Sequence, residues 1–272
     1  MPKPIEDNFA QNVYSAARYF ETLQEWFSTS PHASAYTRST LGVVDGQPIV
    51  LLRPTAPIEG PNLIVGATFH GEEPAGAWGV MTYLFQELGA APPANISFLP
   101  LVNPTGLNRG TRHNVFGENP NAGWIRTGTT SPETSAEAKA ILANIDLIAD
   151  LGQDGVLSLH EDWEQARGYL YAYEQAGASP AWREGLLAVI AEAFGVADAA
   201  EAPYAPLDNG VALNHRDGSF EDFMFENGAK RAYCTETPGL RDLPSRIRAN
   251  CLLIKAFVAS ATDTKGLGHA ER

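Results

Sequence analysis

The chain has 272 residues, of which 44% are hydrophobic and 19% are charged, as is ordinary for a globular protein. Its 32 acidic residues outnumber the 19 basic ones, so the formal net charge is −13. This balance argues against a nucleic-acid surface, because neutralising phosphates requires clustered Lys and Arg. The length is enough for one large α/β domain or two small ones with a substantial core.

Cysteine usage and hydropathy indicate where the protein works. The two cysteines, Cys234 and Cys251, lie in apolar stretches and cannot build a disulfide framework, which predicts a reducing compartment. The first residues lack the apolar core of a signal peptide. No stretch approaches the roughly 18 consecutive apolar residues of a membrane span. We therefore expect a cytoplasmic protein that binds neither nucleic acid nor membrane.

The first half of the chain alternates helix and strand signals. Apolar residues at helical spacing predict a helix over 8–27. Two strands within 37–55 flank Asp45 and Gly46, a typical hairpin turn. The other elements predicted in this half are a buried strand at 62–69, a helix at 74–88 that starts with a proline, and a buried strand at 96–104.

The second half begins with residues 107–133, whose Gly, Asn and Thr content predicts a long irregular loop of a length that usually has a functional reason. Helices and strands then alternate again. They are a helix at 135–150, strands at 155–160 and 169–174, a helix at 179–195 capped by Ser179, a strand at 231–236 and a helix at 243–261.

This alternation predicts the fold class, an α/β domain with a mixed, mostly parallel sheet and helices on both faces. No repeat or linker divides the chain. We therefore expect residues 1–272 to form a single catalytic domain. Its motif-bearing core spans about residues 40–260, and we expect the tail at 262–272 to be flexible.

Four of the predicted strands end in polar residues of catalytic type, namely His70, Asn103, His160 and Glu236. In an open α/β sheet, ligands bind outside the carboxyl ends of the strands. If these strands are parallel, all four side chains fall on one edge of the sheet.

The residue types at that edge suit a zinc-dependent hydrolase. Two histidines and a carboxylate with one open position are a recurring catalytic zinc arrangement, which His70, Glu73 and His160 would supply for one Zn²⁺ per chain. Glu236 is the candidate base for a metal-activated water, and Arg112 the candidate partner of the developing oxyanion. The His70–Glu73 spacing alone is weak, because six histidines and 32 acidic residues give about 0.7 such pairs by chance.

Four ordered segments together carry a stronger signal. They are FHGEEPAG, VNPTG with an arginine six residues past its glycine, LSLHED and CTETPG. Over about residues 40–260 they resemble the zinc carboxypeptidase family, in the superfamily that also holds succinylglutamate desuccinylase and aspartoacylase. The resemblance implies a zinc carboxypeptidase-like fold and metallopeptidase activity on peptide amide bonds. It also implies the metal ligands named above, Arg112 as the group polarising the scissile carbonyl, and Glu236 as general base and then acid.

One segment departs from the family pattern. Family carboxypeptidases grip the terminal carboxylate of the substrate with an Asn-Arg pair, whereas ENPNAG keeps Asn121 and places Ala122 where the arginine would be. Substitutes from other positions are Arg109, Arg126 and Arg216. The candidate substrate-binding residues are Asn121, Asn103, His215 and Arg216.

Two alternatives therefore stay open beside the metallopeptidase. One is a zinc-dependent deacylase acting on small N-acyl amino acids, which the missing arginine favours. The other is a non-catalytic zinc-binding module, although closed structural sites normally carry four protein ligands.

The remaining polar residues have simpler interpretations. We expect Glu161 and Asp162 to be solvated or to orient His160. The pair formed by Glu221 and Asp222 is interpreted as exposed and acidic. Cys234 is expected to be a buried thiol rather than a nucleophile.

Overall fold

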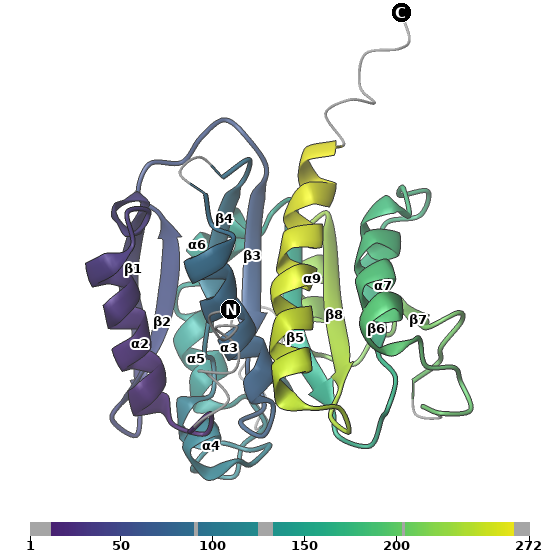
Figure 1. The fold of residues 1–272 in the computed structure, drawn as a ribbon, viewed down its shortest axis with the longest axis horizontal. Coiled ribbons are helices and arrows are strands. Elements are labelled where there is room, and N and C mark those ends of the chain that lie inside the picture. The colour runs from purple at the N-terminus through teal and green to yellow at the C-terminus, as the bar shows by residue number, and fades with distance from the viewer. Residues whose placement is uncertain (1–11, 90–91, 125–132, 203–204, 264–272) are drawn as a thin grey trace, which may run out of the picture.

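A computed structural model describes residues 12–89, 92–124, 133–202 and 205–263. Its centre is an eight-stranded sheet with the order β1-β2-β4-β3-β5-β8-β6-β7 (Figure 1). The strands are β1 (Tyr36–Val44), β2 (Gln47–Pro54), β3 (Asn62–Ala67), β4 (Asn95–Leu99), β5 (Gly155–Asp162), β6 (Tyr169–Glu174), β7 (Val211–Leu213) and β8 (Arg231–Pro238).

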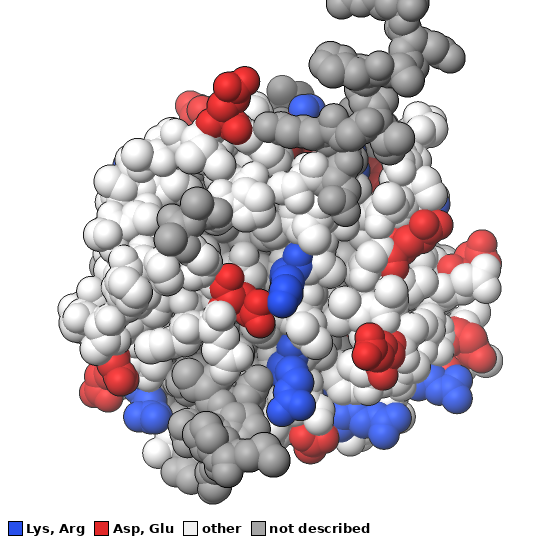
Figure 2. Space-filling model, turned by 45° about the horizontal axis from the view of Figure 1, so that its top comes forward, with Lys and Arg blue, Asp and Glu red and all other residues white. Residues whose placement is uncertain are grey.

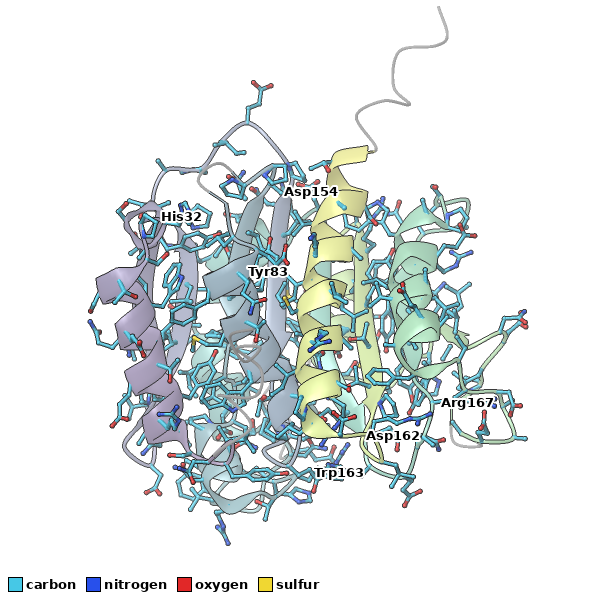
Figure 3. The ribbon with its side chains drawn as sticks, in the orientation of Figure 1. His32, Tyr83, Asp154, Asp162, Trp163 and Arg167 are labelled. Atoms are coloured by element: carbon cyan, nitrogen blue, oxygen red, sulfur yellow. The ribbon has the colours of Figure 1, made fainter. Side chains whose placement is uncertain are left out.

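The central strands β4, β3, β5 and β8 are mutually parallel, whereas β1 with β2, β2 with β4, and β6 with β8 pair antiparallel. This confirms the predicted mixed, mostly parallel sheet. It also brings the carboxyl ends of the four motif-bearing strands to one edge. Figure 3 marks this edge, because Asp154 lies before β5 at one end of the sheet and Asp162 ends β5 at the other.

Helices cover both faces of the sheet, as predicted. In Figure 1, α2 (Ala16–Thr29), α3 (Pro74–Gln86), α7 (Ala181–Phe194) and α9 (Leu243–Asp263) lie in front of it, and α5 (Ala136–Leu142) and α6 (Ile145–Leu151) lie behind. Two buried apolar clusters separate the layers, one around Trp78 on α3 and one around Phe220 on α8 (Phe220–Glu226). Within the described ranges, no helix is long and apolar enough to cross a bilayer.

Several element boundaries differ from the sequence-based expectation. The first helix starts at Ala16, where Ser15 accepts a hydrogen bond from the Arg18 N–H, and residues 8–11 of the predicted helix lie outside the described ranges. The first three residues of the loop expected at 107–133 belong to a short helix, α4 (Pro104–Arg109), and residues 125–132 are not described. The expected flexible tail also lies outside the described residues from 264 onward.

Two predicted helical features were wrong in detail. The helix expected at 135–150 is two helices, because Asn144 interrupts it and donates its side-chain amide to the carbonyls of Leu41 and Ala140. Ser179 is not the N-cap residue of α7, which is Pro180, but its Oγ accepts a hydrogen bond from the Ala181 N–H at 3.4 Å.

A close backbone approach fixes the sheet edge that carries the motifs. A Cβ on Gly71 would lie 1.9 Å from the carbonyl carbon of Gly106, so no side chain fits between the turn after β3 and α4. Asn103 caps α4 by accepting a hydrogen bond from the Gly106 N–H at 2.8 Å. The FHG and NPTG segments are therefore in direct contact, which positions His70.

Candidate metal centre

A constrained turn between β3 and α3 presents His70 and Glu73. Thr68 has φ of 53°, in the left-handed region that a β-branched residue rarely adopts. Its Oγ1 donates to the Glu73 carbonyl at 2.9 Å, and its own carbonyl accepts from the Asn103 N–H at 2.9 Å. Glu73 then directly precedes α3, whose first residue is Pro74. These contacts hold the turn in a conformation that would otherwise be unfavourable.

The three predicted metal ligands lie together and are buried. His70 Nδ1 lies 2.6 Å from Glu73 Oε1, and His160 Nδ1 lies 2.9 Å from Glu73 Oε2. One ligand atom from each of the three residues lies within 4.8 Å of the others, which makes them a candidate metal cluster. His160 reaches the cluster from β5, where its backbone pairs with Glu236 of β8.

An amide oxygen lies behind His70. Asn119 Oδ1 is 3.1 Å from His70 Nε2, and the same oxygen accepts a hydrogen bond from the Asn121 N–H at 3.0 Å. Because this atom is an acceptor, His70 Nε2 must be the donor. In the neutral ring, Nδ1 is then a lone pair that faces a carboxylate oxygen.

A carboxylate lies behind His160. Glu221 is 1% exposed, and its Oε1 lies 3.4 Å from His160 Nε2. Asn121 bridges this pair, because its Nδ2 lies 3.3 Å from His160 Nε2 and 3.5 Å from Glu221 Oε2. Its Oδ1 accepts from the Phe220 N–H at 3.0 Å. The expectation that Glu221 and Asp222 are exposed was wrong, since helix α8 turns both carboxylates into the protein.

The buried charges shift the pKa values of the cluster. Burial raises the pKa of Glu73, but the charges of His70 and His160 and their hydrogen bonds outweigh it and lower the pKa to about 2. Burial lowers the pKa of His70, and Glu73 does not fully compensate. Burial also lowers that of His160, but the carboxylates of Glu73 and Glu221 raise its pKa well above the ordinary value.

These features fit a divalent metal. Both Nε2 atoms face oxygen acceptors, which is the usual outer arrangement of metal-bound histidines and leaves both Nδ1 atoms directed at Glu73. When His70 is neutral with its proton on Nε2, its Nδ1 and the ionised Glu73 oxygen 2.6 Å away are two lone-pair donors that a shared cation would stabilise. Two nitrogens and a carboxylate suit zinc.

Glu236 and Arg112, the predicted catalytic residues, lie beside this cluster. Arg112 Nη1 is 3.7 Å from Glu73 Oε1, and the arginine side chain is 47% exposed. Glu236 is partly buried, and its pKa is raised to about 8, mainly by burial and then by Glu73 and Asp162, against the opposing charges of His160 and Arg112. Both residues line a cavity of about 370 Å³ at the carboxyl edge, whose other lining residues are His70, Glu72, Glu73, Glu161, Asp162, Trp163, Glu164, Tyr169 and Tyr171.

The four candidate substrate-binding residues have different surroundings. Asn103 is fully buried, and its amide donates to the carbonyls of Phe69 and Arg112. The amide of Asn121 bonds within the protein, as described above. His215 lies against the Tyr171 ring, with centroids 5.7 Å apart, and Tyr171 lines the cavity.

The arginines that were proposed to replace the missing clamp are engaged elsewhere or not described. Arg216 pairs with Asp222 at 2.6 Å and Glu226 at 3.4 Å on helix α8. Arg109 donates to the Val115 carbonyl at 3.3 Å. Arg126 lies outside the described residues.

Residues next to the motifs have structural partners. Glu161 is buried, accepts from the Ala75 N–H at 2.7 Å and forms an ion pair with Arg246, so it is not solvated. Asp162 accepts a hydrogen bond from the Tyr169 hydroxyl at 2.7 Å. Cys234 is buried as predicted, and burial followed by the charge of Glu236 raises the pKa of its thiol well above the ordinary value.

The sequence did not predict two residues that contact the imidazoles of the cluster, Asn119 and Glu221. Asn119 lies in the ENPNAG segment, in which the family resemblance indicates Asn121 as the functional residue. Glu221 stands in a run of acidic residues that carries no sign of burial except the apolar residues flanking it.

The chain resembles known proteins among solved structures. No family model and no curated protein sequence matches the chain. A crystal structure from Shewanella amazonensis described as a "putative metallopeptidase" is 34% identical, with 92% of this chain and 94% of that one covered and a TM-score of 0.85. A Shewanella denitrificans protein of the same description is 34% identical, with 92% of each chain covered and a TM-score of 0.82. A metallo-carboxypeptidase from Burkholderia cenocepacia shares the fold at 18% identity, with 92% of this chain and 69% of that one covered and a TM-score of 0.65.

The mixed sheet, the buried cluster at its carboxyl edge and these neighbours place the chain in the metallopeptidase class by fold and by site. The identity and coverage of the Shewanella structures specify the relationship further. The chain belongs to the same metallopeptidase family as the Shewanella structures, and it has the fold of the metallo-carboxypeptidases.

Proposed function

We propose that the protein is a zinc-dependent hydrolase of amide bonds in peptides, with one Zn²⁺ held by His70, Glu73 and His160. One observation carries the proposal. Both histidines direct Nδ1 at the same carboxylate while an oxygen lies behind each Nε2, and Glu236 lines the adjoining cavity. A non-catalytic module would have no need of a partly buried acid beside an open ligand position.

The mechanism assigns a separate task to each group. A bound zinc ion supplies Lewis acidity towards a carbonyl and a water. Glu236 takes the proton from that water at its carboxylate and later delivers it to the leaving amine. Its raised pKa suits the second half of this exchange, because a carboxyl with a pKa of about 8 holds a proton to deliver near neutrality. The charge of a bound cation would lower that pKa and leave the carboxylate ionised for the first half. Arg112, whose guanidinium reaches the cavity, stabilises the oxyanion.

Asn103 and Asn121 act by positioning in this scheme. Asn103 bonds to the backbone on both sides of the site, and the amide of Asn121 contacts Glu221 and the start of α8. His215 packs against the ring of Tyr171, which lines the cavity, so His215 is the candidate to contact the substrate there. Asn119 and Glu221 orient the two metal-binding imidazoles.

A deacylase acting on N-acyl amino acids is the second candidate. The observation that favours it is the engagement of Asn121 within the protein, next to Ala122 in place of an arginine. A substrate without a peptide terminal carboxylate would not require that clamp.

Charge and cysteine usage support the expected partners. Lys and Arg side chains are interspersed with Asp and Glu on the face drawn in Figure 2, so this face offers no continuous basic surface for a polyanion. Cys234 and Cys251 are buried and form no disulfide, in keeping with the cytoplasmic location that we propose.

The decisive experiment combines metal analysis with a substrate screen. The purified protein is assayed for bound zinc, then for hydrolysis of a peptide library and of N-acyl amino acids, with and without a chelator. We expect about one zinc per chain, hydrolysis that chelation abolishes and zinc restores, and loss of turnover in Glu236→Gln with zinc still bound. Release of amino acids from peptides supports the peptidase, and cleavage of only N-acyl amino acids supports the deacylase. Chelator-resistant activity would contradict both.

A further inference from the structure

We propose that Cys234 and Glu236, together with His160, form a second ligand set that captures a thiophilic divalent cation and so removes Glu236 from catalysis. The capture stands on the geometry alone, whereas its inhibitory effect rests on the function proposed above.

Strand register brings the three side chains together. Cys234 and Glu236 are two residues apart on β8, so they point to the same face of the sheet. His160 pairs directly with Glu236 on the neighbouring strand β5. Cys234 Sγ lies 3.7 Å from Glu236 Oε1, and one ligand atom of each of the three residues lies within 4.8 Å of the others. The side chains therefore need only small adjustments to share one ion.

The two ligand sets of the centre differ in chemical softness. His70, Glu73 and His160 offer nitrogen and oxygen, whereas the second set replaces one imidazole with sulfur. Thiolate ligands favour soft ions such as Cd²⁺, and zinc accepts sulfur, nitrogen and oxygen. On binding, the S–H bond of Cys234 breaks, a sulfur–metal bond forms, and the proton passes to solvent without any change of oxidation state.

Capture at the second set competes with the proposed chemistry in two ways. His160 belongs to both sets, so an ion held by Cys234 draws on the imidazole that the first set needs. A Glu236 carboxylate that is bound to a cation cannot accept a proton from water. A thiophilic cation should therefore inhibit even in the presence of zinc.

The chain provides a matched control for the sulfur ligand. Cys251, the other cysteine, is buried on α9 and belongs to no candidate ligand cluster in the described part of the protein. Cys251→Ser therefore removes one thiol without touching the second set.

The binding test titrates metal-free wild type, Cys234→Ser and Cys251→Ser with Cd²⁺ and follows the ultraviolet sulfur-to-cadmium charge-transfer band. We expect the band in wild type and in Cys251→Ser and its loss in Cys234→Ser. Circular dichroism confirms that each variant is folded, and Cys234→Ala replaces the serine variant if that one is not. Absence of the band in wild type, or its persistence without Cys234, overturns the proposal.

The activity test adds Cd²⁺ to the zinc-loaded enzyme. We expect the half-inhibiting concentration to rise roughly tenfold or more in Cys234→Ser, as for the loss of a metal-site interaction, and to stay unchanged in Cys251→Ser. Equal inhibition of wild type and Cys234→Ser overturns the inhibitory role. If the protein has no hydrolase activity, the proposed function fails, but the charge-transfer band still decides whether the second set binds a cation.

Discussion

Replacing Glu221 with Gln tests how far the carboxylate behind His160 supports metal binding. Glu221 is 1% exposed, and its Oε1 lies 3.4 Å from His160 Nε2. Glutamine keeps the shape and an acceptor oxygen but removes the negative charge that favours an electron-rich imidazole. Loss of such an outer partner costs roughly 10–100-fold in metal affinity, or about 1.4–2.7 kcal/mol.

The assay is competition for Zn²⁺ between the protein and a chromophoric chelator at neutral pH. Asn119→Asp is the matched variant, because it places a carboxylate 3.1 Å behind His70, where the wild type has a neutral amide oxygen. We expect Glu221→Gln to weaken zinc binding and Asn119→Asp to strengthen it. A folded Glu221→Gln protein with wild-type zinc affinity would refute the idea that this carboxylate acts through His160.

Three further predictions concern the base, the oxyanion partner and the turn. The pKa of Glu236 is raised to about 8 from 4.5, so the folded protein binds more protons than the unfolded chain between these pH values and loses stability as pH rises through them. In urea unfolding of the metal-free protein, the free energy of unfolding of Glu236→Gln minus that of wild type should therefore increase from pH 4.5 to 8 and stay constant above. A difference that does not depend on pH would contradict the raised pKa of Glu236. Arg112→Ala should lower turnover by roughly 10²–10³-fold with zinc affinity little changed, as steady-state kinetics and chelator competition would report; unaltered turnover excludes the oxyanion role. Gly71→Ala should lower the free energy of unfolding by roughly 3 kcal/mol or more, because its Cβ would lie 1.9 Å from the backbone of α4. The control Gly89→Ala, whose Cβ would have nothing within 4 Å, should change it by no more than about 0.5 kcal/mol in thermal unfolding. Equal effects of the two substitutions would show that the turn relaxes freely.

The sequence predicted the proximity of the cluster residues where that proximity depends on local pattern. His70 and His160 follow or end buried apolar strands, and parallel pairing of β3 with β5 is enough to bring them to one edge. Glu73 follows from its spacing to His70 and from Pro74 at the start of a helix. Each of these positions follows from the direction of a strand or from the short turn after it.

Contacts that depend on the path of irregular segments could not be predicted in the same way. Glu221 reaches His160 only because the seven-residue helix α8 packs against the sheet beside β5. Asn119 belongs to a loop without periodicity, so no pattern indicates which of its polar residues faces His70. The break at Asn144 likewise depends on a hydrogen bond to Leu41, which lies about a hundred residues away in the chain. Tertiary partners decide all three.

The pKa values of the two histidines shift in opposite directions, and this difference helps to stabilise the buried cluster in the absence of a metal. His160 lies between the carboxylates of Glu73 and Glu221, which raise its pKa, so in the metal-free protein both of its nitrogens carry protons that face carboxylate oxygens. His70 has a lowered pKa and a neutral amide oxygen behind it, so it loses its extra proton at lower pH than His160 does. The extra proton on His160 thus compensates the buried carboxylates until an ion replaces it, which explains how two carboxylates and two imidazoles remain buried together at acceptable cost. A metal bound there would displace that proton, and of the two imidazoles His70 is the one that gives up a proton more readily.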